Sequence, residues 1–268
     1  MLLTVNVGNS RISVGGFEVE SCELQFQFSV STDLSKTSDE YAVLLRSLLQ
    51  EHTKDGTVTD GVIVSSVVPQ ITETILRTLQ RISGKEPLLV GPGVKTGFSI
   101  KIDSPSELGG DIVANTAAVI EDLKRQGKEH VPSVVVDMGT VTTVSAINRG
   151  GDYVGCVILP GVRMSFDSIH GQTAQLPNVI LSAPEKAIGK NSSDAIRSGV
   201  LYGTAMMLDG FVGRFAKEMK CHAEELNPVI TGEYASAVAH ICRHTFVREE
   251  NLTLRGLCYL YRKTVLAK

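Results

Sequence analysis

Short apolar runs alternate with helical patterns along the first third of the chain. The runs that predict strands are Leu2–Val7, Ile12–Phe17, Leu24–Ser29, Asp60–Val68 and Leu88–Val90. Between them, Thr37–Leu49 and Ile71–Ile82 carry apolar residues at helical spacing. We expect the first three strands to form an antiparallel meander. Strands followed by alternating helices and strands predict a mixed sheet with helices, an α/β domain.

The second half of the chain repeats this plan. Strands are predicted at Ser133–Asp137, Thr142–Ile147, Tyr153–Leu159 and Val229–Thr231. Helices are predicted up to His170 and over Asn191–Met219, Ala235–His244 and Gly256–Lys263. Because no flexible linker interrupts the chain, the domain boundary should fall inside the helix predicted over Asp111–Gln126. We expect two similar domains, residues 1–117 and 118–268.

One turn motif occurs once in each half. Asn6 and Gly8 stand at the end of the first strand, and Asp137 and Gly139 stand at the end of its counterpart. Backbone N–H groups at such glycine turns can hold an anion. A plain hairpin explains either copy by itself. Two copies together predict a nucleotide in the cleft between two similar domains, and the acidic and hydroxyl side chains suit phosphoryl transfer.

The stretch Asp103–Gln126 carries a strong helix signal. Ser104 and Glu107 form a capping box, which places the helix start at Ser104. The expected buried stripe is Ile112, Val113, Thr116, Ala117, Ile120 and Leu123. Asp111 and Asn115 stand one turn apart and should lie on the opposite face.

Two glycines in the first turns of this helix precede an acidic residue. Gly109 and Gly110 cost helix stability but let a ligand or another backbone approach closely. Asp111 directly after them is a candidate base held near a ligand. The alternative is a solvated aspartate of the first helical turn, stabilised by the helix dipole.

Composition and charge narrow the class of protein. The net charge is −3 in 268 residues, with no long run of either sign, which argues against a nucleic-acid surface. No apolar stretch approaches the roughly 20 residues of a membrane span, and MLLTVNVG lacks the features of a signal peptide. The hydrophobic share of 43% supplies ample core. These features predict a soluble, cytoplasmic protein.

The cysteines and histidines offer little metal chemistry. Five cysteines are scattered without a CxxC pair, so reduced cytosolic thiols are a simpler interpretation than a disulfide framework or zinc site. His240 and His244 would share a helix face, but Cys242 would point away and no acidic partner is near in sequence. We therefore expect a structural or surface role for these three residues.

The ordered set of motifs resembles the type III pantothenate kinases, members of the acetate-kinase/sugar-kinase/Hsp70/actin superfamily. In the first half the matching motifs are VGNS, SSVVP at Ser65–Pro69, GVKTGFSI at Gly93–Ile100 and SPSELGGD at Ser104–Asp111. In the second half they are VVDMGTVTT at Val135–Thr143, LPG at Leu159–Gly161, LP at Leu176–Pro177, GKNSSDAIRSGV at Gly189–Val200, TG at Thr231–Gly232 and LTLRGL at Leu252–Leu257. The resemblance implies two actin-like (ribonuclease H-like) domains and transfer of the ATP γ-phosphate to pantothenate, the first step towards coenzyme A.

The resemblance also implies roles for individual residues. Those implied to bind ATP are Asn6, Val7, Gly8, Asn9, Ser10, Arg11, Ile12, Ser13 and Thr140. Asp111 matches the general base, and the residues implied to contact pantothenate are Gly109, Gly110, Asp111, Ile112 and Ser192. Asp137 matches the ligand of a monovalent cation, potassium or ammonium, and magnesium accompanies ATP. Family members are dimers, so a homodimer is implied too.

Three positions depart from the family pattern. The family has Asp where this chain has Asn6, so a carboxylate that helps hold magnesium is missing. Ile112 replaces an Arg that would pair with the pantothenate carboxylate. Glu233 replaces the second glycine of a turn near the adenosine. Arg163, Lys190 and Arg197 are candidate replacements for the missing cation, with solvated surface charge as the alternative for each.

Two hypotheses follow. In the first the chain is an active pantothenate kinase, because Asp111, Asp137 and Thr140 are all present. In the second it is a degenerate member that binds a ligand or partner without turnover. A sugar kinase of the same superfamily is a distant third, since the matching motifs outside the phosphate turns fit pantothenate kinases.

Overall fold

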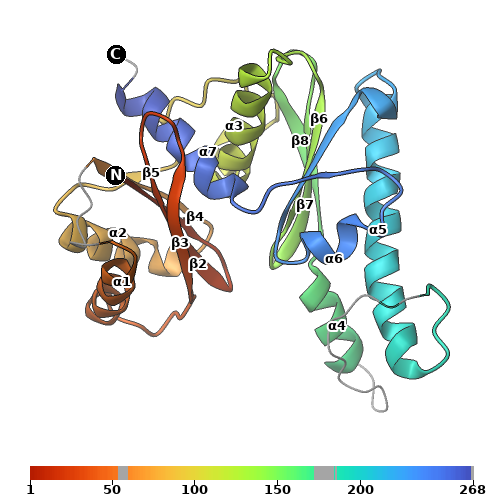
Figure 1. Cartoon of the computed structure of the whole chain (residues 1–268), viewed down its shortest axis with the longest axis horizontal. Coiled ribbons are helices and arrows are strands. Elements are labelled where there is room, and N and C mark those ends of the chain that lie inside the picture. The colour runs from red at the N-terminus through yellow and green to blue at the C-terminus, as the bar shows by residue number, and fades with distance from the viewer. Residues whose placement is uncertain (54–59, 172–183, 185, 267–268) are drawn as a thin grey trace. The chain divides into compact units, whose positions relative to one another are not determined.

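The computed structural model describes residues 1–53, 60–171, 184 and 186–266. The chain divides into two compact units (Figure 1). Unit 1 comprises Met1–Ser99, Asp103–Asp122 and Asn251–Lys268, and unit 2 comprises Ile100–Ile102 and Leu123–Glu250. The change of unit falls inside a helix, α3 (Gly110–Arg125). The division expected from the sequence differs in the C-terminal segment, which the contacts assign to unit 1. The Leu176–Pro177 motif lies outside the described residues.

Unit 1 is built on a five-stranded sheet. Its strands are β1 (Leu2–Val7), β2 (Arg11–Phe17), β3 (Leu24–Ser31), β4 (Gly61–Ser66) and β5 (Leu88–Leu89). The strand order is β3-β2-β1-β4-β5, with β1 antiparallel to β2 and parallel to β4. Its other elements are α1 (Ser38–His52), α2 (Pro69–Ser83), a 3-10 turn at Pro105–Glu107, α3, α7 (Leu252–Tyr261) and a π turn at Arg262–Leu266.

Successive side chains of β1 point to opposite faces of this sheet, and different helices cover the two faces. Leu3, Val5 and Val7 belong to a buried cluster with side chains of α1 and α2. Successive residues of a strand point to opposite faces, so Thr4 and Asn6 point the other way. On that face α7 packs against β1, β2 and β4. Asn6 is therefore the last residue of β1 on the face that α7 covers.

Unit 2 has the same plan. Its strands are β6 (Ser133–Met138), β7 (Val141–Ile147), β8 (Tyr153–Pro160), β9 (Asn227–Gly232) and β10 (Val247–Arg248), in the order β10-β9-β6-β7-β8. Its helices are α4 (Val162–Gly171), α5 (Ser192–Glu218) and α6 (Ala235–Ala239), with a 3-10 turn at Ala223–Glu225. Among the helices in the described ranges, even the 27-residue α5 is not apolar enough to cross a membrane.

The two sheets repeat each other residue by residue around their central strands. β1 and β6 have the same sequence of buried and partly buried positions, and so have β2 and β7. Asn6 pairs with Ser13 on β2, as Asp137 pairs with Thr143 on β7. The prediction of two similar α/β domains is confirmed.

The capping box at the start of α3 was predicted wrongly. The Ser104 side chain makes no capping hydrogen bond, and the 3-10 turn ends at Glu107, followed by Leu108 with an extended backbone. α3 begins only at Gly110, where the Val113 N–H donates to the Gly109 carbonyl at 3.1 Å. Two consecutive glycines weaken helix propensity at this point, so the chain bends before the helix starts.

The predicted exposed face of α3 is also corrected. Asn115 is only 3% exposed, and its Oδ1 accepts a hydrogen bond from the Thr253 hydroxyl of α7 at 2.7 Å. Because α7 covers this side, Ala114 and Ala118 are fully buried as well. α3 is therefore buried over most of its circumference, which its own periodicity did not indicate.

The two last helices have other bounds than predicted. α6 ends at Ala239 rather than His244, because the Asp209 carboxylate accepts the N–H groups of Arg243 and His244 at 2.8 and 3.0 Å. These bonds to α5 hold the chain outside a helical path. α7 starts at Leu252 rather than Gly256.

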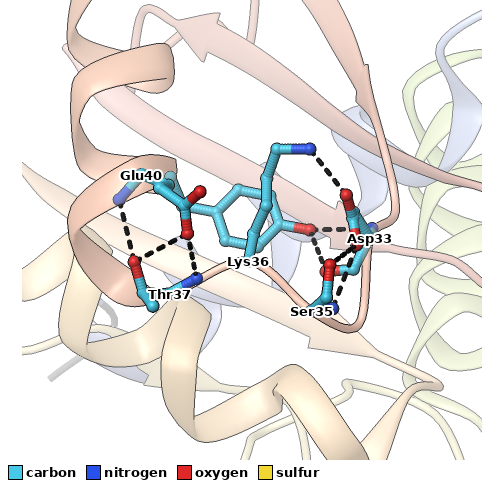
Figure 2. A network of polar contacts seen from close by, with 6 residues as sticks. Asp33, Ser35, Lys36, Thr37 and Glu40 are labelled. Carbon is cyan, nitrogen blue, oxygen red and sulfur yellow. Dashed lines mark hydrogen bonds and ion pairs between the residues drawn. The ribbon is translucent and has the colours of Figure 1, made fainter.

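A polar network fixes the passage from β3 to α1 (Figure 2). Thr37 and Glu40 form a reciprocal capping box at the helix start. The Asp33 carboxylate accepts hydrogen bonds from Lys36 and Ser35, and these donors hold the pKa of Asp33 below its ordinary value. The network begins directly after Thr32, whose hydroxyl donates to the Gly8 carbonyl in the first glycine turn.

Candidate active site

The first glycine turn has a shape held by its own backbone and by Thr32. The Gly8 N–H donates to the Arg11 carbonyl at 2.9 Å, and a Cβ at Gly8 would stand 3.1 Å from that oxygen. The Thr32 hydroxyl donates to the Gly8 carbonyl at 2.6 Å, and the Thr32 N–H donates to the Ser10 carbonyl at 3.1 Å. Thr32, which directly follows β3, thus binds the Gly8 and Ser10 carbonyls. These bonds fix the shape of the turn in the absence of a ligand.

Two buried polar atoms without a hydrogen-bond partner lie beside this turn. Asn6 and Ser65 are direct neighbours on the parallel strands β1 and β4. Asn6 Oδ1 and Ser65 Oγ are both buried and make no hydrogen bond to any residue that the structure describes, and Ser65 is fully buried. A buried polar atom left unpaired costs about 1–3 kcal/mol, so native proteins pair such atoms with a ligand or water. The pair fits a polar ligand at the ends of β1 and β4.

The first residue of α3, Gly110, packs against Ser65 at the end of β4. A Cβ at Gly110 would stand 2.9 Å from Ser65 Oγ and 3.3 Å from the Val90 Cβ. Only a residue without a side chain lets the helix start so near the end of β4. The sequence motifs indicate Gly110 as a site residue but do not indicate Ser65. Its position in the SSVVP motif was visible, but its burial without a partner depends on the neighbouring strand and helix.

Asp111 follows in the first turn of α3. Its Oδ1 accepts the N–H of Ile112 at 2.8 Å. Burial raises the pKa of Asp111 above its ordinary value of 3.8, and it outweighs the backbone hydrogen bonds that lower it. A carboxylate with a raised pKa in a partly buried place has the properties of a general base. Asn6, Ser65, Gly110 and Asp111 thus lie together in unit 1, linked through Ser65.

The second glycine turn, in unit 2, is enclosed by two more glycines. A Cβ at Gly161 would overlap the Thr140 carbonyl and stand 2.8 Å from the Gly139 carbonyl. Gly232 has φ +98°, and a Cβ there would stand 2.6 Å from the Met138 carbonyl. The LPG and TG motifs therefore meet at the Met138–Thr140 turn. This turn is one residue shorter than the first, because β7 begins at Val141 whereas three residues separate β1 from β2.

Asp137 lies on β6 directly before this second turn, and Thr140 is the last residue of the turn. Asp137 is the register neighbour of Thr231 on β9 and of Thr143 on β7. Ser192 lies elsewhere in unit 2, at the exposed first position of α5, where the Asn191 side chain caps the helix by accepting the Asp194 N–H.

The candidate replacement cations have ion-pair partners or are exposed. Arg163 pairs with Asp167 at 3.0 Å along α4, and Arg197 pairs with Asp194 at 3.3 Å along α5. The third candidate, Lys190, is exposed. Glu233, the residue that replaces the family glycine, is exposed as well. Across the described ranges, no group of three or more His, Cys, Asp or Glu side chains is placed to hold a metal ion. His240, Cys242 and His244 therefore do not form such a group.

Fold and site define a class of protein: two mixed α/β domains with the same strand plan, each with a glycine turn at its central strand. Two solved structures share the fold at low identity. A Baf family protein from Campylobacter jejuni has a TM-score of 0.60 at 18% identity, covering 97% of this chain and 98% of that chain. The ethanolamine utilization protein EutJ from Carboxydothermus hydrogenoformans has a TM-score of 0.53 at 13% identity, covering 96% and 89%.

Sequence comparison identifies the family. The model of the type III pantothenate kinase family matches residues 2–214. A type III pantothenate kinase of Halalkalibacterium halodurans is 35% identical over 266 residues, which span 99% of this chain and 100% of that relative. The chain belongs to the type III pantothenate kinase family, ATP-using phosphotransferases that phosphorylate pantothenate in coenzyme A biosynthesis. The resemblance found in the motifs is confirmed.

Proposed function

We propose that this chain phosphorylates the primary hydroxyl of pantothenate in the cytoplasm, with Asp111 as the general base. The observation that carries the proposal is the place of Asp111, a partly buried carboxylate of raised pKa in the first turn of α3, whose start at Gly110 lies against the unpartnered oxygen of Ser65. Asp111 accepts the hydroxyl proton, the freed oxygen attacks the γ-phosphorus of ATP, and ADP leaves.

The glycine turns fit phosphate binding. The turn from Asn6 to Ser13 is pre-formed by Thr32, and the second turn tolerates no side chain at Gly161 or Gly232. We assign the ATP phosphates to the first turn and a further ATP contact to Thr140. Asp137 would hold the monovalent cation, and magnesium would enter with the nucleotide.

Pantothenate is assigned to the start of α3. Gly109, Gly110, Asp111 and Ile112 line this place, and Ser192 completes the set by family resemblance. Ile112 is partly buried and cannot pair with the pantothenate carboxylate. No cation therefore stands at the position of the family arginine.

A binding assay beside a turnover assay tests the proposal. Calorimetric titrations with ATP and with pantothenate should both show binding, and ADP should form only when both are present. Binding of either ligand without turnover would support the degenerate member instead. Turnover with a hexose but not with pantothenate would support a sugar kinase.

Magnesium dependence is expected to change when Asn6 becomes acidic. Asn6→Asp adds a carboxylate oxygen, which magnesium prefers to an amide. We expect a half-saturating magnesium concentration roughly tenfold lower, since about 1.4 kcal/mol of added binding changes an equilibrium tenfold. Gln70→Glu, which adds the same charge at an exposed position of α2, is the control and should leave the dependence unchanged. An unaltered dependence in Asn6→Asp places Asn6 away from the metal.

Affinity for pantothenate is expected to rise when the family cation is restored. Ile112→Arg should lower the Michaelis constant for pantothenate by roughly ten- to a hundredfold, because a charge-assisted pair contributes on the order of 1.5–3 kcal/mol. Ile112→Met, of similar length without charge, is the control. If Ile112→Arg changes nothing and pantothenate neither binds nor turns over, the pocket serves another ligand.

We also propose a homodimer formed through α5. Met206 is 65% exposed and Met207 43% exposed on this helix. Gly199, Gly210 and Gly213 are exposed and recur at helical spacing on the side of Met206, where small residues let a second helix approach closely. Light scattering should give twice the 28.8 kDa chain mass, and a single species at 28.8 kDa would contradict the proposal.

A further inference from the structure

Two cysteine thiols meet inside unit 1, although they stand 236 positions apart in the chain. Cys22 lies in the turn between β2 and β3, and Cys258 lies in α7. Their sulfur atoms are 2.6 Å apart. Both side chains are buried, with exposed fractions of 4% and 0%. The separation exceeds the about 2.05 Å of a disulfide bond by only about half an ångström.

The backbone holds Cys22 in the position that makes this contact. Cys22 has φ +56°, in the left-handed region that residues other than glycine rarely adopt. Its N–H donates to the Glu18 carbonyl at 3.0 Å, and the Glu18 N–H donates to the Glu23 carbonyl at 3.0 Å. A strained residue persists only where its surroundings impose the conformation, and such residues gather at functional places. Here the strain directs a sulfur towards α7.

The environment distinguishes the two sulfurs. The Arg262 guanidinium Nη1 stands 3.8 Å from Cys22 Sγ, and a neighbouring cation favours the reactive thiolate. The hydrogen bond with Cys22 and then burial raise the pKa of Cys258. Ser21 and Glu23 on either side of Cys22 are exposed, so Cys22 is one residue from the surface along the chain in both directions. Cys22 is therefore the attacking thiol and Cys258 the resolving one.

We propose that Cys22 and Cys258 form a reversible disulfide when the protein meets a peroxide. The Cys22 thiol gives up its proton, the thiolate attacks one oxygen of hydrogen peroxide, and the O–O bond breaks; the products are a sulfenic acid and a hydroxide, which takes up that proton as one water. The Cys258 sulfur then displaces the hydroxyl group from the Cys22 sulfur, and its proton leaves with that group as a second water. Two thiols lose two electrons, and one peroxide becomes two waters. A dithiol reductant reverses the reaction by exchange.

The bond would tie the last helix to the N-terminal strands. α7 packs on β1, β2 and β4 and bonds to α3 through Thr253 and Arg255. Closing so long a loop restricts the unfolded chain, which is the main way in which a disulfide stabilises a protein. Oxidation should therefore stabilise unit 1.

Peptide mapping of the full chain tests the assignment without any substitution. After hydrogen peroxide treatment and blocking of remaining thiols, digestion should release a peptide pair joined through Cys22 and Cys258, and dithiothreitol should separate it. On a non-reducing gel the product should remain a single chain. A linked pair containing Cys156, Cys221 or Cys242 overturns the proposal. So does a chain whose Cys22 and Cys258 stay open to alkylation while Cys156 is oxidised.

Thermal unfolding gives the second readout. Peroxide should raise the Tm of the unmodified chain by on the order of 5 °C, and dithiothreitol should return it to its starting value. Cys22→Ser should abolish the shift, while Cys156→Ser, on β8 of unit 2, should keep it. If Cys22→Ser fails to fold, Cys258→Ala replaces it. A peroxide-induced rise that persists in a folded variant lacking either thiol contradicts the assignment.

Discussion

Asp111→Asn is expected to lower kcat at least about a hundredfold, because a positioned general base contributes on the order of 10²–10⁴-fold. The amide keeps the size of the side chain and can still accept the Ile112 N–H, so the fold of α3 should persist. Turnover and the thermal unfolding midpoint, measured together, separate loss of the base from loss of structure. A variant with near-parental kcat would remove Asp111 from the mechanism.

The matched control is Asp103, which precedes the 3-10 turn that leads to α3. Asp103→Asn makes the same change at an exposed carboxylate of the same unit and should leave kcat within about twofold. A pH profile adds a sharper readout. Because burial raises the pKa of Asp111, activity should fall with acidification at a pH above the ordinary 3.8. Asp111→Asn should lack this acidic decline in its residual activity.

Much of the fold followed from local pattern. β1, β2, β6 and β7 were predicted to within two residues, since apolar and β-branched residues at alternating depth decide strands. The bounds of α6 and the buried face of α3 did not follow. They depend on Asp209 of α5 and on α7, which lie far away along the chain. Local propensity cannot register such contacts.

The candidate site divides in the same way. Asn6, Gly110 and Asp111 stand in short motifs whose chemistry the sequence displays. Ser65 belongs to a motif too, but its meaning arises only when β4 lies beside β1 and α3 starts against it. The contact of Cys22 with Cys258 joins the two ends of the chain. Both features are products of packing, so the sequence alone could not assign them.

Gly256→Ala is expected to destabilise the protein by about 2 kcal/mol or more. Gly256 lies in α7, and a Cβ there would overlap the Ala114 carbonyl oxygen and stand 2.5 Å from its carbon. Alanine gains at most about 1 kcal/mol of helix propensity over glycine. The obstacle is backbone of α3, which cannot rotate away as a side chain can, so overpacking outweighs propensity. Denaturant unfolding should show the loss as a lower midpoint.

The same substitution connects stability to the site. Ala114 lies one turn from Asp111, and Thr253 of α7 bonds to Asn115 beside it. Pushing α7 away from α3 should therefore displace the first turn of α3, and kcat should fall along with the midpoint. Gly91→Ala is the control, since a Cβ at that exposed glycine of unit 1 meets nothing within 4 Å. If Gly256→Ala unfolds at the parental midpoint, α3 and α7 do not pack backbone against backbone, and the support for Asp111 must come from another contact.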